Sequence, residues 1–121
     1  MAGVEVKNVA APDETRPFAD KGLAHVVQVS GHPVLHGVFE PGWRWSEHVK
    51  PVAQTDQCMA THLLYCLSGR MHIVMEDGSE ADIGPGDVAA VSPGHDAWVV
   101  GDEPCVAVDF GGYADYARSR G

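Results

Sequence analysis

The sequence predicts an all-β fold, an antiparallel sandwich or barrel of eight or nine short strands. Short runs rich in Val, Leu and Ile follow one another, and turn residues separate them. No stretch of ten or more residues carries apolar positions at helical spacing; only 113–118 has the pattern of a terminal helical turn. The 121 residues include fourteen Gly and eight Pro, more than an average protein holds, which suits a fold with many turns.

The first half of the chain opens with residues 1–20, which show no periodic pattern and are expected to form an extended arm. The expected strands that follow are 23–30, ending at Gly31-His32-Pro33, then 34–40, ending at Pro41-Gly42, and 43–49. A polar stretch separates the last of these from the second half. A barrel domain over 21–112 is therefore expected to follow the arm.

The second half repeats the same alternation of apolar runs and turns. The expected strands are 58–67, ending at Ser68-Gly69, then 71–76, ending at the hairpin signal Asp77-Gly78, and then 88–91, 97–100 and 105–110. Gly84-Pro85-Gly86-Asp87 is a turn before 88–91. Residues 113–121 are expected to be a C-terminal tail, and no repeat or second domain is visible.

Charge and cysteine content narrow the classes of partner and the compartment. The formal charge of −9 argues against nucleic acid or an anionic membrane as a general partner. No apolar run reaches the length of about 18–20 residues that a membrane span needs, and residues 1–16 lack the apolar core of a signal peptide. Three Cys is an odd number, so we expect a soluble protein in the reducing cytoplasm.

Residues 43–50, taken as one strand, would have a polar and an apolar face, because side chains alternate along a strand. Arg44, Ser46, His48 and Lys50 would share one face, and Trp43, Trp45 and Val49 the other, together with Glu47. We expect the polar face to point into a barrel cavity and the Trp pair to be covered by the arm or by a second subunit, which predicts a homodimer. The alternative is a solvated polar face with the Trp pair in the core.

The spacing of several of these residues resembles the cupin superfamily. Gly42 precedes His48 and Lys50 as in the first half of the first cupin motif, and His62, which six residues separate from Gly69, stands where that motif has Glu. Gly86-Asp87 through Ser92-Pro93-Gly94 resembles the second motif. The resemblance covers about residues 35–110 and points to small single-domain bacterial cupins of the conserved-barrel type (cupin_2). It implies a cupin-type double-stranded β-helix, a jelly-roll barrel, with the extended arm in front.

The resemblance also implies a metal centre, but this chain departs from it. Cupin centres typically use three His and one Glu, whereas the four positions here are His48, Lys50, His62 and Ala97. Eleven residues, 51–61, separate the second position from the third, where the family has three or four. Metal binding is therefore either rearranged or lost.

A rearranged site has a physical route through His95, which lies two residues before Ala97 and would point to the same side of an extended chain. His48, His62 and His95 would then bind one divalent metal ion, Zn, Fe, Ni or Cu, with an open position. Cys58 is a weaker fourth ligand. The alternative is that these are ordinary His residues, hydrogen-bonded to their neighbours.

Other polar residues have less specific roles. Arg44 and Lys50 would bind the carboxylate of a small anionic ligand. Asp96 orients His95 as a ligand, acts as a base or is an exposed turn carboxylate, and His72 is a weak candidate for the pocket. The sequence assigns Tyr65 and Trp98 to packing and gives no role to His25, His32 or His36.

Two functions compete. One is a metal-dependent enzyme of dioxygenase, isomerase or cyclase type that acts on a small organic acid or carbonyl compound, as some cupins do. The other is a binding or sensing module without chemistry, which the missing Glu and fourth His favour. The sequence has no nucleophile elbow and no paired carboxylates at a candidate site, so hydrolysis has no support, and no single catalytic residue is assigned.

Overall fold

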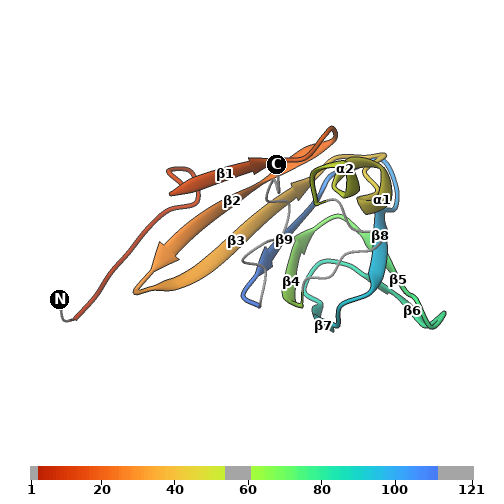
Figure 1. Ribbon diagram of the computed structural model, residues 1–121. Coiled ribbons are helices and arrows are strands. Elements are labelled where there is room, and N and C mark those ends of the chain that lie inside the picture. The colour runs from red at the N-terminus through yellow and green to blue at the C-terminus, as the bar shows by residue number, and fades with distance from the viewer. Residues whose placement is uncertain (1–2, 54–60, 112–121) are drawn as a thin grey trace.

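Two antiparallel sheets form the protein in the computed structural model, which describes residues 3–53 and 61–111 (Figure 1). The larger sheet has six strands in the order β1 (Glu14–Pro17), β2 (Gly22–Val29), β3 (His32–Phe39), β9 (Cys105–Asp109), β4 (His62–Ser68) and β7 (Val88–Val91). The smaller sheet has three, in the order β6 (Glu80–Ile83), β5 (Met71–Met75) and β8 (His95–Val99). The predicted all-β jelly roll is confirmed.

The inner faces of the two sheets share one core, because alternate residues of each strand point inward. On β8, for example, His95, Ala97 and Val99 are buried while the residues between them are half-buried. The core draws on every strand except β1, and Phe18, directly after β1, joins it. Polar side chains that lie on these inner faces are therefore removed from water.

Two strands were not expected from the sequence. β1 pairs with β2 from Glu14↔Val26 to Pro17↔Leu23, so the predicted arm, residues 1–20, includes one strand of the larger sheet. β6 pairs with β5 and completes the hairpin that Asp77-Gly78 predicted. Both strands have only four residues and mostly exposed side chains, which leaves little periodic signal.

The segment predicted as a strand at 43–49 is mostly helical, and that prediction is wrong. Only its first residues pair with β8, through an Arg44↔Trp98 bridge and a hydrogen bond from the Val99 N–H to the Trp43 carbonyl. The chain then turns into two short helices, α1 (Trp45–His48) and α2 (Lys50–Ala53), beside one end of β8 (Figure 1). None of the described helices has the length and apolarity of a membrane span.

The helices bury the side chains that the alternation had placed on the outside. Trp45, Val49 and Ala53 recur every four residues, and all three are buried on the inner side of the helical pair. Trp43 and Trp45 are each only 2% exposed. The Trp pair therefore belongs to the core, as the alternative from the sequence had it, and Phe18 of the predicted arm packs against Trp43. The homodimer stays a prediction.

Position 69, the last of the first cupin motif, requires glycine because the backbone of Pro104 lies very close to it. It has a φ of 76°, and a Cβ atom there would lie 2.2 Å from the Pro104 carbonyl oxygen. The β4–β5 turn can thus lie directly against the start of β9, which keeps β9 in the middle of the larger sheet.

Candidate functional site

A small cavity of about 40 Å³ lies in the core between the two sheets, with room for a few water molecules. The described residues around it are mostly apolar: Leu35, Phe39, Trp43, Trp45, Leu64, Met71, Ile73, Val91, Ala97 and Ala107, together with His62, His95 and Asp109. Two imidazoles and one carboxylate thus face an environment of low polarity, where electrostatic interactions are strong.

Asp109 and His62 form a buried pair at the cavity. His62 begins β4 and Asp109 ends the neighbouring β9, and the His62 Nδ1 lies 2.5 Å from the Asp109 Oδ2. The second carboxylate oxygen, Oδ1, accepts the backbone N–H groups of Leu63, at 3.1 Å, and Gly111, at 2.8 Å. Every acceptor atom of this carboxylate is therefore used, as a buried carboxylate requires.

Gly111 makes room for this arrangement. A Cβ atom at this position would lie 2.7 Å from the Leu63 nitrogen, the atom that donates to the same carboxylate. A larger residue would push the two strands apart at the point where Asp109 joins them.

The Asp109 carboxylate fixes the tautomer of His62. A carboxylate oxygen accepts a hydrogen bond, so Nδ1 of the neutral imidazole carries the proton and Nε2 carries the lone pair. This is the arrangement by which a carboxylate orients a histidine base and stabilises the imidazolium that forms when the histidine takes up a proton.

His95 is fixed in the same way from the second sheet. It begins β8, it is 3% exposed, and its Nδ1 lies 2.8 Å from the Ser92 carbonyl oxygen, which only accepts. Its ring packs edge-on against His62, with ring centroids 5.1 Å apart. The cavity thus brings together two imidazoles whose Nδ1–H groups are both held by acceptors.

The expectation that His95 and Ala97 point to the same side is confirmed, because both line the cavity. Ala97, at the position of the usual cupin histidine, supplies no ligand atom. His95 lies one rung earlier on β8, with its ring next to that of His62.

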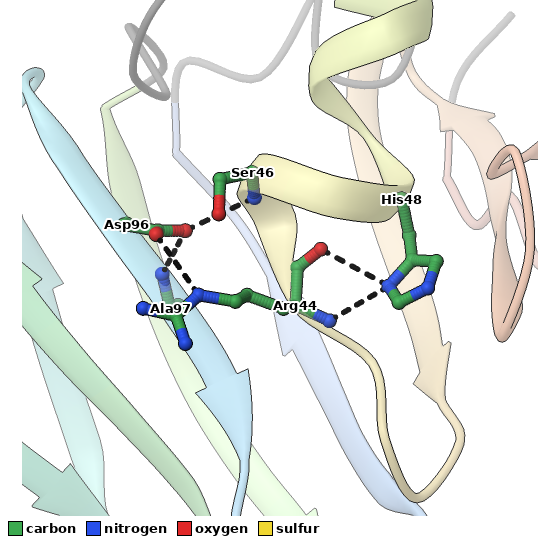
Figure 2. A network of polar contacts seen from close by, with 5 residues as sticks. All are labelled: Arg44, Ser46, His48, Asp96 and Ala97. Carbon is green, nitrogen blue, oxygen red and sulfur yellow. Dashed lines mark hydrogen bonds and ion pairs between the residues drawn. The ribbon is translucent and has the colours of Figure 1, made fainter.

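His48 does not join this pair. It belongs to α1, and its ring lies against the main chain of Arg44, where Nδ1 accepts the Arg44 N–H at 2.9 Å (Figure 2). Nδ1 also lies 3.2 Å from the Arg44 carbonyl oxygen. The physical reason is the helix: a strand would have aimed His48 into the barrel, whereas α1 turns it back to satisfy an N–H at the helix start.

Arg44 and Asp96 fasten α1 to β8 outside the cavity. Asp96 Oδ1 accepts the N–H groups of Ser46, at 3.1 Å, and Ala97, at 2.9 Å, while Oδ2 lies 3.4 Å from the Arg44 Nε (Figure 2). The Arg44 guanidinium lies over the Trp98 ring, 4.3 Å from its centroid. Asp96 is thus neither a ligand-orienting residue nor an exposed turn carboxylate, and neither it nor Arg44 lines the cavity.

The remaining predicted residues also lie elsewhere. Lys50 begins α2 and is not among the described residues around the cavity. The His72 Nδ1 lies 2.5 Å from the Asp82 Oδ1, and its ring packs at a tilt against Trp98 on the smaller sheet. His72 is not among the described residues that line the cavity. Cys58, the proposed fourth ligand, falls outside the described residues.

The described residues do not fit the metal centre that the cupin resemblance implies. Within 3–53 and 61–111, no three His, Cys, Asp or Glu side chains are grouped so that they could hold one ion. His62 and His95 supply two imidazoles, fewer than the three protein ligands of a catalytic zinc site. His48 is directed to Arg44, so metal binding by the set of three stays a prediction without geometric support.

Asp109 is the functional residue that sequence reasoning missed. The sequence holds a signal for Asp109, because Cys105, Ala107 and Asp109 occupy every second position of β9, share its inward face and are all buried. An aspartate on the inward parity of an apolar strand requires a partner. The identity of that partner, 47 residues earlier in the chain, has no local signal.

Comparison with known proteins identifies the fold through solved structures only. No family model matches the sequence, and no curated protein matches it. Among solved structures, the chain is similar to a sugar phosphate isomerase of the cupin superfamily from Silicibacter pomeroyi, with 21% identity over 79% of this chain and 68% of that one and a TM-score of 0.57. It is also similar to ectoine synthase from P. lautus, with 15% identity, 89% and 78% coverage and a TM-score of 0.59.

A third similar structure has no assigned function. It is a protein from Acidithiobacillus ferrooxidans with 14% identity, which covers 80% of this chain and 85% of its own, with a TM-score of 0.58. At these identities the likeness shows the fold alone. Together with the two sheets described above, it shows that this chain has the cupin fold.

Proposed function

We propose that this chain is an enzyme that moves a proton on a small carbonyl compound, with His62 as the base. The observation that carries the proposal is the buried Asp109–His62 pair in a mostly apolar cavity, with the His95 ring beside it. Such a pair has little purpose in a core that only packs, because burying polar groups costs free energy that apolar side chains of similar size would not.

The reaction follows from the order of the groups. His62 Nε2 removes a proton from the carbon next to the carbonyl group, the electron pair of that C–H bond forms a C=C bond, and the π pair of the carbonyl group moves to its oxygen to give an enolate. Asp109 accepts the Nδ1–H throughout and stabilises the imidazolium. In an α-hydroxy carbonyl compound, transfer of the hydroxyl proton to the enolate oxygen and return of the carbon-bound proton to the former carbonyl carbon, by His62 or by His95, turn the hydroxyl carbon into the new carbonyl and complete an isomerisation. An isomerase among the fold neighbours agrees with this class of reaction.

Hydrogen–deuterium exchange at the α-carbon tests the proposal. The protein is incubated in D₂O with hydroxyacetone, glycolaldehyde or dihydroxyacetone, and loss of the α-proton signals is followed by ¹H NMR. His62→Gln removes the base and is expected to slow exchange by about 10²–10⁴-fold. His72→Gln is the matched control, because His72 also pairs with an Asp but lies outside the cavity.

Chelator treatment separates this mechanism from metal chemistry. Exchange by His62 is expected to continue after EDTA, since the base and its orienting carboxylate belong to the chain. Loss of exchange with EDTA would restore the metal-dependent enzyme predicted from the sequence. Exchange that persists unchanged in His62→Gln would contradict the proposal, and a protein that binds these compounds without exchanging their protons would be the binding module.

A further inference from the structure

Two buried indole N–H groups have no hydrogen-bond acceptor. Trp43 and Trp45 are each 2% exposed, and the Nε1 of neither has a partner within the parts of the chain that the structure describes. An indole N–H only donates, so it requires an acceptor from somewhere. Both residues line the cavity of His62 and His95.

The protein holds these rings in place. Trp43 packs against the Phe39 ring, with centroids 4.6 Å apart, and against Phe18 at 5.8 Å. The backbone carbonyl of Trp43 accepts the Val99 N–H, at 3.0 Å, and the backbone N–H of Trp43 donates to the Glu40 carbonyl oxygen. Trp45 is the first residue of α1, whose start Asp96 fastens to β8. The two unpaired N–H groups, on rings held this firmly, therefore require an acceptor from outside the described residues.

The charges around the cavity define that acceptor. Among the described lining residues, Asp109 is acidic, and none is Lys or Arg. A carboxylate ligand would bring a second negative charge beside Asp109 into an apolar space without a cation to balance it. The oxygen of an uncharged carbonyl compound accepts both N–H groups without that cost.

We propose that Trp43 and Trp45 donate the hydrogen bonds that hold the oxygen of an uncharged ketone or aldehyde in the cavity. This rests on the proposed function for the reaction and names its class of substrate. When His62 removes the α-proton, negative charge develops on this oxygen, and the two indole N–H groups stabilise it as an oxyanion hole does. The anionic ligand expected from Arg44 and Lys50 gives way to an uncharged one.

The indole resonances report on this directly. The chain has three Trp, and Trp98 is an internal control because it lies outside the cavity, between His72 and Arg44. Protein labelled with ¹⁵N-tryptophan is titrated with acetone, and with acetate as a charged molecule of the same size. We expect saturable downfield shifts of the Trp43 and Trp45 indole protons with acetone, and no such shift of Trp98 or with acetate.

Single substitutions assign the resonances and measure each donor. Trp43→Phe and Trp45→Phe keep an aromatic ring and remove the N–H, and each is expected to weaken acetone binding by about 3- to 10-fold. Trp98→Phe is expected to leave binding unchanged. Should a buried substitution prevent folding, the titration of the unaltered protein still decides, because all three indoles are observed in one spectrum.

The outcomes distinguish this inference from the proposed function. Indole protons that do not respond to acetone would mean that water alone fills the cavity, and would overturn it. A response to acetate equal to that to acetone would overturn the preference for an uncharged ligand. Indole shifts without α-proton exchange would support the inference and refute the proposed chemistry, whereas exchange without indole shifts would do the reverse.

Discussion

Substitution of Asp109 gives the sharpest prediction, because one carboxylate accepts hydrogen bonds from three residues: His62 and Leu63 at the start of β4, and Gly111 just after β9. In Asp109→Ala, the N–H groups of Leu63, Gly111 and His62 all lose their acceptor. A buried donor without a partner costs about 1–3 kcal/mol. We expect a loss of about 3–5 kcal/mol in the free energy of unfolding, since water entering the space satisfies part of the need.

Asp109→Asn separates the two oxygens. The amide oxygen can keep both backbone N–H groups, while the amide nitrogen faces His62 and removes the charge-assisted bond. The expected loss is about 1–2 kcal/mol, the difference between a charged and a neutral hydrogen bond. The amide N–H also forces His62 into the opposite tautomer, so α-proton exchange should fall much further than stability does.

Urea unfolding measures both variants. With a slope of about 2 kcal/mol per molar urea, the midpoint should fall by about 0.5–1 M in Asp109→Asn and by about 1.5–2.5 M in Asp109→Ala, at an unchanged slope. Equal losses in the two variants would refute the bridging role of Oδ1. A normal exchange rate in a folded Asp109→Asn protein would refute its role in orienting His62.

Three further predictions concern residues outside the cavity. His48→Ala removes the acceptor of the Arg44 N–H at the start of α1. The free energy of unfolding in urea should fall by about 1 kcal/mol, without a change in α-proton exchange, and an unchanged urea midpoint would contradict this role of His48. Burial, with Cys66 beside it, raises the pKa of the Cys105 thiol to about 12. Iodoacetamide at pH 8 should therefore leave Cys105 of the native protein unmodified, as measured by peptide mass spectrometry, and rapid alkylation would contradict this. Burial, and then the facing His25, lowers the pKa of His36 below the 6.5 of a free imidazole, so on acidification the unfolded state binds the proton first. The melting temperature should therefore fall as the pH drops below about 6.5, and it should fall less in His36→Gln. An equal fall in both proteins would contradict this reasoning.

Most of the fold was predictable because its signals are local. Alternating apolar runs and glycine turns located β2, β3, β5, β7, β8 and β9 to within about two residues. The segment after Trp43 was not, since Trp43, Trp45 and Val49 fit a strand as well as a helix. Two clues favoured the helix: Ala53 extends the spacing of four, and a strand with the Trp pair in the core would also have turned Glu47 into the core. The acceptor that begins the helix, Asp96, lies 50 residues away and has no local signal.

The residues of the candidate site likewise fall into those with a local signal in the sequence and those without one. His62 was predictable from its motif position and His95 from the alternation of side chains two residues before the motif position Ala97, because register decides which side chains of a strand point inward. His48 failed because its motif position lies in the segment whose conformation was misread. Asp109 and the two unpaired indoles depend on contacts between distant elements, which neither composition nor periodicity encodes.

The place of β9 in the larger sheet also governs how the protein comes to be folded. It is the latest of the described strands in the chain, yet it lies between β3 and β4 and joins the two halves of the sheet. Until residues 105–109 have left the ribosome, those two strands present unpaired edges that invite association with other chains. Pairing over such sequence separations is slow, typically milliseconds to seconds. A nascent chain that has β3 and β4 but not yet β9 is therefore exposed to aggregation, and a chaperone that shields strand edges should raise the yield of folded protein.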